Sequence, residues 1–225
     1  MASRPGRRTG PQPPVVPAGL EVVALEGLHH EDEIEASRLD GTDLTGAHAE
    51  DLRLTQCEWR AVRLAAADLP GLSAADVRLD DCDLTGALLP KASLLRVELT
   101  GCRLDELVLS DGRLGDARFV DCRLNEVSLR FSRAERVTFT DCVLRGADLT
   151  GAQLSSVRFE GCDLRQSVWF NASAAGTQLV RCQVDGLKGA TSLKGASVTP
   201  DQVLPLSLSL LAELGITVSD DQGDP

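Results

Sequence analysis

An apolar side chain occupies every fifth position from Ile34 to Val184, without exception over 31 successive positions. Five residues is neither the 3.6-residue spacing of a helix nor the alternation of an ordinary strand, which excludes an amphipathic helix bundle and a plain β-sandwich. A five-residue unit is too short to enclose a core alone, so each unit must stack on copies of itself. The register therefore predicts a solenoid with one continuous core.

A second inward row lies two positions before each of these apolar sites. Small residues (Ala, Cys, Val, Ser, Thr or Gly) fill 27 of its 31 positions. Of the 44 Asp, Glu, Lys and Arg residues between 32 and 186, 43 fall on the other three positions of each unit, and Asp32 is the exception. Two positions of every five are thus predicted to point inward and three outward.

The cysteines indicate how many units make one turn. They recur every twenty residues on the small inward position, and three phenylalanines repeat the same interval: Cys82, Cys102, Cys122, Cys142, Cys162 and Cys182, with Phe119, Phe139 and Phe159. Four units per turn predict four faces, on which equivalent residues stack at the spacing of neighbouring strands, ~4.8 Å.

This pattern resembles the pentapeptide-repeat family, whose loose consensus is Ala-Asp/Asn-Leu-x-x. Four segments carry the match: Ala67-Asp68-Leu69, Cys82-Asp83-Leu84-Thr85-Gly86, Ala147-Asp148-Leu149-Thr150-Gly151 and Cys162-Asp163-Leu164. The resemblance covers about residues 32–190 and implies an all-β fold, a right-handed quadrilateral β-helix (a pentapeptide-repeat solenoid) of nearly eight coils with a short C-terminal α-helix. Glycine at ten of the 31 last positions suits corners with positive φ.

The flanking segments differ in composition from the repeats. Residues 1–17 hold five of the ten prolines and three arginines, which predicts a disordered arm. We expect an N-terminal cap or linker at 18–31, the β-helix at 32–190, a linker at 191–198, a C-terminal helix at 199–215 and a disordered acidic tail at 216–225. The arm lacks the apolar stretch of an export signal, and no segment approaches the ~18 apolar residues of a membrane span, so a cytoplasmic protein is expected.

Seven cysteines do not predict disulfides or zinc binding here. Stacked thiols in one ladder run parallel to one another, and an odd count suits a reducing compartment. Zinc requires converging ligands, and no Cys-x-x-Cys spacing occurs. The metal-like run His29-His30-Glu31-Asp32-Glu33 is interpreted instead as a hydrated edge before the first coil. Neither a metal site nor a cofactor is predicted.

Catalytic motifs are missing from the sequence. It contains no tyrosine, no Gly-x-x-x-x-Gly-Lys-Ser/Thr loop and no Gly-x-Ser-x-Gly elbow. Carboxylates on the outside of a narrow solenoid stay hydrated, unlike the desolvated groups of general acid–base sites. A protein that is not an enzyme is predicted.

Acidic residues are concentrated in the first coils. Residues 32–85 hold 13 acidic and 5 basic side chains, a balance of −8, whereas residues 86–186 hold 13 of each. The predicted acidic binding face comprises Asp40, Asp43, Glu50, Asp51, Glu58, Asp68, Asp76, Asp80, Asp81 and Asp83. Because duplex DNA also carries negative charge at a fixed pitch, such a rod could occupy a basic DNA-binding groove.

The resemblance extends to the mycobacterial fluoroquinolone-resistance and Qnr-type members of the family, which bind DNA gyrase as DNA mimics and protect it from quinolones. It implies gyrase, or another DNA-binding protein, as the partner, with no direct binding of nucleic acid and no membrane association. Two alternatives stay open: the acidic face only keeps the rod soluble, or the protein is a general interaction scaffold without nucleic-acid mimicry.

A helix with its own start signal follows the repeats. Thr199-Pro200-Asp201-Gln202 reads as an N-cap, a first-turn proline and a capping box, and Gly215 is a natural stop. One leucine stripe can cover the open end of the solenoid, and the surplus apolar residues favour a homodimer, as the resemblance also implies. Dimerisation is assigned to Val203, Leu206, Leu210, Leu211 and Leu214; an intramolecular cap alone is the alternative.

A second contact surface is predicted from apolar residues at outward positions. The twenty-residue coil places them on one face: Leu88, Val108, Phe131, Val168 and Phe170. Exposed apolar patches mark contacts in many soluble proteins. The alternative is that residues 15–28 fold back over this face.

Overall fold

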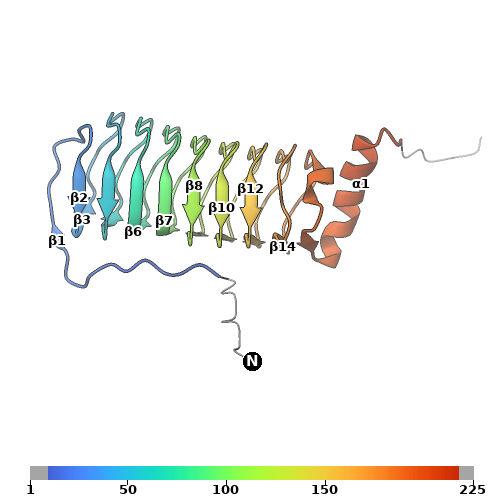
Figure 1. Ribbon diagram of the computed structural model, residues 1–225, viewed down its shortest axis with the longest axis horizontal. Coiled ribbons are helices and arrows are strands. Elements are labelled where there is room, and N and C mark those ends of the chain that lie inside the picture. The colour runs from blue at the N-terminus through green and yellow to red at the C-terminus, as the bar shows by residue number, and fades with distance from the viewer. Residues whose placement is uncertain (1–9, 218–225) are drawn as a thin grey trace, which may run out of the picture.

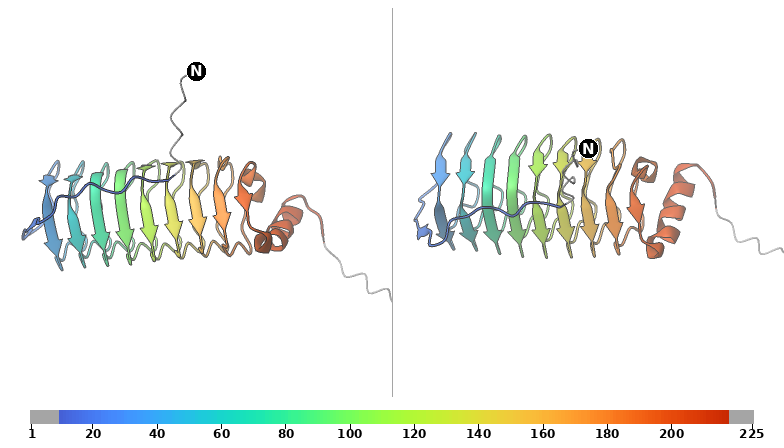
Figure 2. Two further views of the ribbon diagram at one scale, coloured as in Figure 1. Left: turned by 90° about the horizontal axis from the view of Figure 1, so that it is seen from below. Right: turned by 60° about the horizontal axis from the view of Figure 1, so that its bottom comes forward.

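The computed structural model describes residues 10–217, which form one elongated β-solenoid closed at its C-terminal end by a helix (Figure 1). All strand pairs are parallel, and each residue pairs with its equivalent one turn later, as Phe119 does with Phe139. The N-terminal arm (residues 10–17) runs back along the outside of the coils (Figure 2).

Two ladders of short strands share β6 (Ser73–Asp80) and β7 (Ser93–Thr100). The first ladder contains in addition β2 (Glu33–Glu35), β4 (Arg53–Thr55), β8 (Arg113–Gly115), β10 (Arg133–Glu135) and β12 (Gln153–Ser155). The second contains β1 (Glu21–Val22), β3 (Ser37–Asp40), β5 (Glu58–Arg60), β9 (Arg118–Val120), β11 (Thr138–Thr140), β13 (Arg158–Glu160), β14 (Gln178–Val180) and β15 (Ser197–Val198).

Two further ladders consist of single bridges repeated every twenty residues. One runs from Asp43 to Gln183 and the other from His48 to Lys188. The described chain therefore pairs along four parallel ladders per twenty-residue turn, as the sequence predicted. The solenoid has about nine turns rather than nearly eight, because β1 and β15 extend the second ladder beyond both ends of the predicted repeat.

The fifth-position row forms the core. Every member except Ile34 is buried, and Ile34 packs against the core from the first coil. The Phe119, Phe139 and Phe159 rings stack with centroids 4.7 and 4.8 Å apart. This is the strand spacing, so the side chains repeat at the pitch that the backbone ladders impose.

The cysteine ladder is an apolar column whose thiols bond to main-chain carbonyls. All seven thiols are free and buried. Cys102, for example, donates to the carbonyls of Leu79 and Thr100, at 3.4 Å each. The neighbouring thiols of Cys122 and Cys82, together with burial, raise the pKa of Cys102. Such a thiol is a packing residue rather than a nucleophile or metal ligand.

The last position of each five-residue unit lies at a corner with positive φ. All ten glycines at this position have φ between 64° and 82°. Asp, Glu, Arg and even Phe131 (φ 56°) adopt the same conformation at other corners. The corner requires the left-handed region, which glycine adopts without cost and aspartate tolerates better than most residues.

The C-terminal cap begins with η1 (Ala190–Leu193), continues through β15 and η2 (Pro200–Gln202), and ends in α1 (Val203–Glu213). The segment expected to be a linker at 191–198 thus contains a helical turn and a strand. Pro205 lies in the first turn of α1, where the amide has no intrahelical acceptor, so it neither kinks nor splits the helix. Gly215, with φ 70°, follows the last turn.

Gln202 joins this cap to the last coil. Its side chain is 1 % exposed, and Nε2 donates to the Cys182 carbonyl at 3.2 Å, an acceptor that a further coil would otherwise have used. Its Oε1 accepts the Thr199 amide at 2.8 Å, the capping interaction predicted from the sequence. The Glu213 carboxylate accepts the Ala190 amide at 2.6 Å and ties the other end of α1 to η1.

Candidate binding surfaces

The ten predicted acidic residues do not share one face. Three lie on the second strand ladder, three on the two bridge ladders and three at corners, and Glu50 immediately precedes the Asp51 corner. Most are paired with arginine or histidine on their own or a neighbouring coil: Asp40–Arg38, Asp43–Arg63, Glu58–Arg60, Asp68–His48, Asp76–Arg96, Asp80–Arg60 and Asp83–Arg103. The flat faces are therefore partly neutralised, although residues 32–85 keep a balance of −8.

The pKa values follow these local contacts. Hydrogen bonds from the Thr45 hydroxyl and amide, with help from Arg63, lower the pKa of Asp43. Burial on the second ladder raises the pKa of Asp80.

Within the repeat (residues 32–186), seven carboxylates at corners have no ion-pair partner in the described chain. We call them the corner acids, and they are all exposed: Asp51, Asp81, Glu106, Asp111, Asp121, Glu126 and Asp141. Asp81, Asp121 and Asp141 occupy the same corner on different coils. The twenty-residue register places them at multiples of the coil rise, ~4.8 Å. Only Asp51 and Asp81 of these belong to the predicted set.

Asp76 is a correction to that set, because it is not a surface carboxylate. It is 8 % exposed and receives two bonds from Arg96: Nε to Oδ1 and Nη2 to Oδ2, both 2.6 Å. Its Oδ1 also accepts the Val15 amide of the arm at 2.9 Å. Arg96 first, and then the Val15 amide, lower its pKa against the opposing effect of burial. This carboxylate holds the arm and does not face solvent.

The arm was predicted to be disordered over residues 1–17. Residues 10–17 instead lie along the solenoid (Figure 2), and residues 1–9 fall outside the described chain, as do 218–225 of the predicted acidic tail. The structure differs from the alternative in which residues 15–28 fold back over the apolar face. The arm runs over the corner of Asp76 and Asp116, and Leu88 stays 43 % exposed.

The predicted apolar face divides into two groups: Leu88, Val108 and Val168 on one bridge ladder, and the pair of phenylalanines Phe131 and Phe170. Leu88 and Val108 are neighbours on one bridge ladder, whereas Val168 is three coils beyond Val108 on the same ladder. Phe131 (54 % exposed) and Phe170 (47 % exposed) lie near the C-terminal half. Phe131 lies across Gly151, where an added Cβ would meet the ring at 2.5 Å. Both groups leave apolar surface uncovered in the described chain.

Only part of the predicted dimerisation set is available on α1. Leu206 is buried against the coil and acts as the cap, whereas Val203 and Leu214 are 55 % and 65 % exposed. Leu210 and Leu211 are partly accessible. Leu204 and Leu208, at 70 % and 52 %, are exposed without having been assigned to the set. Leu208 also lines a groove of about 490 Å³ with Phe170 and Lys188.

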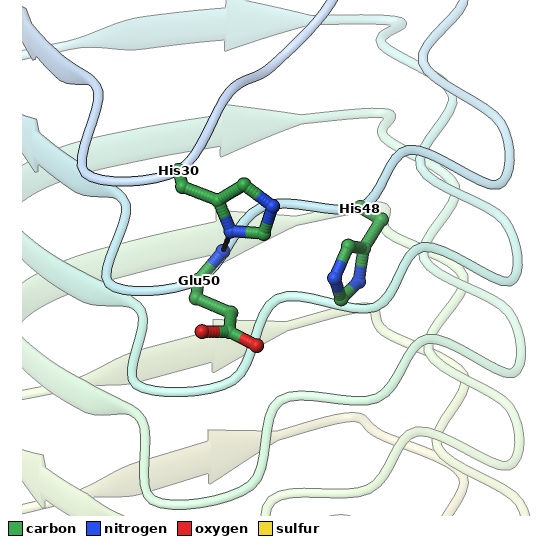
Figure 3. A group of neighbouring side chains, drawn as sticks. All are labelled: His30, His48 and Glu50. Atoms are coloured by element: carbon green, nitrogen blue, oxygen red, sulfur yellow. Dashed lines mark hydrogen bonds between the residues drawn. The ribbon is translucent and has the colours of Figure 1, made fainter.

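The one group that could hold a metal ion in the described chain is His30, His48 and Glu50 (Figure 3), whose ligand atoms lie within 4.8 Å of one another. All three are exposed. The Nδ1 of His30 accepts the Glu50 amide at 3.1 Å, so the neutral ring carries its proton on Nε2. The Nδ1 of His48 lies 3.1 Å from Asp68. His30 could ligate a metal ion only by giving up its bond to the backbone.

Four parallel ladders on a five-residue unit define the described chain as a β-solenoid. Two family models match it, "Pentapeptide repeats (8 copies)" at residues 78–116 and "Pentapeptide repeat region" at residues 122–188. The chain belongs to the pentapeptide repeat protein family. No curated protein matches its sequence. Within residues 10–217 no helix is long and apolar enough to cross a bilayer.

Several solved structures are similar to this chain at low sequence identity. HetL, a pentapeptide repeat protein involved in heterocyst differentiation regulation in the cyanobacterium Nostoc sp., is 20% identical, with a TM-score of 0.31 over 76% of this chain and 91% of HetL. Trypsin-treated QnrB1, a plasmid-mediated fluoroquinolone resistance protein, is 16% identical, with a TM-score of 0.30 over 89% of this chain and 97% of its own. Rfr23 of the cyanobacterium Cyanothece is 16% identical, with a TM-score of 0.20 over 72% and 91%.

Proposed function

We infer that the protein is a non-enzymatic binding protein of the cytoplasm, which presents carboxylates at fixed heights on a rigid rod to a basic DNA-binding surface. The observation that carries this proposal is the set of exposed corner acids without ion-pair partners, on a chain of net charge −11. Seven free buried thiols are compatible with a reducing compartment. The resemblance of its repeats to fluoroquinolone-resistance members of the family makes DNA gyrase the leading candidate partner.

Electrostatic complementarity would act here mainly on the rate and specificity of association. Exposed carboxylates on a rod attract a cationic groove over a distance of about one Debye length, ~8 Å at physiological salt. The corner acids lie where the chain turns and carry no arginine partner, unlike most of the acidic residues on the flat faces. This restricts the proposed contact to edges of the rod rather than to the whole acidic set.

The test is a titration of the full chain into a gyrase supercoiling reaction at two salt concentrations. Changing Asp81, Asp121 and Asp141 together to Asn is expected to weaken inhibition or quinolone protection by about tenfold, because three charges at one edge are removed. Higher salt is expected to weaken the wild-type effect in the same direction. Asp201→Asn is the matched control, since Asp201 is exposed but lies on η2, outside the coils.

An effect on gyrase that survives both the triple substitution and high salt would contradict DNA mimicry. The absence of any effect on gyrase at every concentration would remove gyrase as the partner.

A general interaction scaffold is the second candidate, and the exposed apolar residues favour it. Phe131 and Phe170 remain about half exposed, and the Arg130 guanidinium lies 5.3 Å from the centre of the Phe131 ring. Aromatic residues beside arginine are frequent at the centres of protein interfaces. In this case Phe131→Ser would abolish partner capture, while the corner-acid triple variant would retain it.

A homodimer through α1 completes the proposal. The exposed side of the helix, with Val203, Leu204, Leu208 and Leu214, is more apolar than a monomeric surface helix requires. Leu206 is assigned to the intramolecular cap and Leu208 to the dimer surface, which revises the set derived from the sequence.

A further inference from the structure

The arm is held by two receptors of identical construction. Asp76 receives Nε and Nη2 of Arg96, and its Oδ1 accepts the Val15 amide. Asp116 receives Nε and Nη2 of Arg136, at 2.8 and 2.9 Å, and its Oδ1 accepts the Gln12 amide at 3.1 Å. In both cases an arginine one coil further on fixes the carboxylate and leaves Oδ1 directed at the arm. The same unit thus occurs twice along the rod.

The spacing of the two receptors matches one conformation of the arm. Asp76 and Asp116 are forty residues apart, two coils, which is ~9.6 Å at the strand spacing. Gln12 and Val15 are three residues apart, which is ~9.3 Å in a polyproline II helix. That helix has three residues per turn, so both amides point to the same side, whereas a β-strand would turn them to opposite sides. Pro13 and Pro14 between them favour this conformation and carry no competing amide.

The register of the arm is unique on this corner. The corner column, at twenty-residue intervals, contains only two acidic residues: Ala36, Gln56, Asp76, Arg96, Asp116, Arg136, Ser156 and Gly176. Arg118 adds a third polar contact, Nη2 to the Pro11 carbonyl at 3.0 Å. Pro14 is buried between the two bonded amides, while Val15 remains 65 % exposed. The solenoid therefore recognises main-chain atoms and one proline of the arm, and not the other side chains of the arm.

We propose that this corner is a binding site for polyproline-type segments, and that the arm is its resident ligand. A Pro-rich segment of a partner protein with the pattern x-Pro-Pro-x, in which both x residues carry an amide, replaces the arm. Two observations support exchange: the polar contacts of the arm come from three main-chain groups, and Gln12, Pro13 and Val15 are exposed. Since the contacts are to the main chain, any segment of that pattern can make them. This site is independent of the corner acids.

The experiment uses the full chain with Gln12→Pro and Val15→Pro, which keeps the arm in the polyproline conformation but removes both donated bonds. A fluorescent peptide with the sequence of residues 10–18 is titrated into this variant and into the wild type, and binding is followed by anisotropy. We expect binding to the variant at least about tenfold tighter than to the wild type, in which the resident arm competes.

The control is a second peptide with proline in place of Gln12 and Val15, which has the same conformation without the two amides. It is expected not to bind, and this comparison leaves the folded protein unchanged. Asp116→Asn in the variant chain is expected to weaken binding of the first peptide, with circular dichroism to verify the fold. Equal binding of the two peptides, or no binding of the first to the variant, would overturn the proposal and leave the arm as a permanent clamp.

Discussion

The two buried tryptophans differ in how their indole N–H is satisfied. Trp169 donates to the Ser167 hydroxyl at 2.9 Å, and Ser167 donates in turn to the Leu164 carbonyl. Trp59 is 1 % exposed, and its Nε1 has no partner in the described chain. The residue two positions earlier is Cys57, whose sulfur donates to carbonyls instead. A thiol at this position leaves a buried donor unpaired, at a cost of roughly 1–3 kcal/mol.

Cys57→Ser is therefore expected to stabilise the protein. The hydroxyl would give the Trp59 indole the acceptor that Ser167 gives Trp169, raising the free energy of unfolding by about 1 kcal/mol. Chemical denaturation followed by tryptophan fluorescence measures the change. Cys102→Ser is the matched control, because the residue two positions later is Leu104 instead of a tryptophan, and it is expected to destabilise. A loss of stability in Cys57→Ser equal to that of the control would contradict this account.

At the scale of single residues, the sequence predicted which side chains point inward but not which acidic side chains are exposed and without an ion-pair partner. Asp76 and Asp81 both occupy outward positions of the repeat, yet one is buried under the arm and the other is exposed. The difference depends on Arg96 one coil away and on a segment sixty residues earlier in the chain. The alternation of Asp and Arg at twenty-residue intervals from 76 to 136 was the available signal.

Among the elements, α1 combines two roles on different sides. Leu206 is buried in the hydrophobic core, Gln202 bonds to the Cys182 carbonyl of the last coil, and Glu213 bonds to the Ala190 amide of η1. The start of this helix followed from Thr199 and Gln202 in the sequence. The division between cap and exposed side did not, because the leucines occupy most of the circumference and only packing against η1 decides between them.

Leu206→Ala and Leu208→Asp are expected to separate these roles. The first removes buried side-chain volume and should lower the free energy of unfolding by about 2–3 kcal/mol. The second should convert a dimer to a monomer in analytical ultracentrifugation, with little change in the stability of the monomer. A wild-type protein that is monomeric at every concentration would refute the dimer and leave α1 as a cap alone.

For the whole molecule, the repeat register predicted the ladders, the buried rows and the position of the corners. The number of turns exceeded the prediction because β1 and β15 pair without belonging to the five-residue pattern. Hydrogen bonding of the main chain, rather than side-chain periodicity, extends the sheet there. The docked arm was beyond sequence analysis for a related reason, since its contacts use amides and a carbonyl that every sequence possesses.

Acid should weaken the solenoid through its arginine-bound carboxylates. Arg96 and Arg136 lower the pKa values of Asp76 and Asp116, so their stabilising contribution is complete above the unfolded value, about 3.9, and is lost as pH falls through the lower folded values. We expect a constant contribution from pH 8 to 5 and a decline below about pH 4.

Thermal unfolding across this range measures the effect, and Asp116→Asn should flatten the decline. Asp80→Asn is a control in which ionisation has the opposite effect on stability. Burial raises the pKa of Asp80, so its ionisation lowers the free energy of unfolding. A decline of unchanged slope in Asp116→Asn would show that other carboxylates govern acid unfolding.

The spacing of Asp76 and Asp116 along the rod and the spacing of the Gln12 and Val15 amides in the arm are matched to each other. Family members can in principle gain or lose twenty residues without disturbing the packing of what remains, since every turn has the same height. Here such a change between Asp76 and Asp116 would put the two acceptors out of step with Gln12 and Val15. A chain of this kind can therefore vary its number of turns freely at its ends, but between those two carboxylates the spacing of the N-terminal segment holds the count constant.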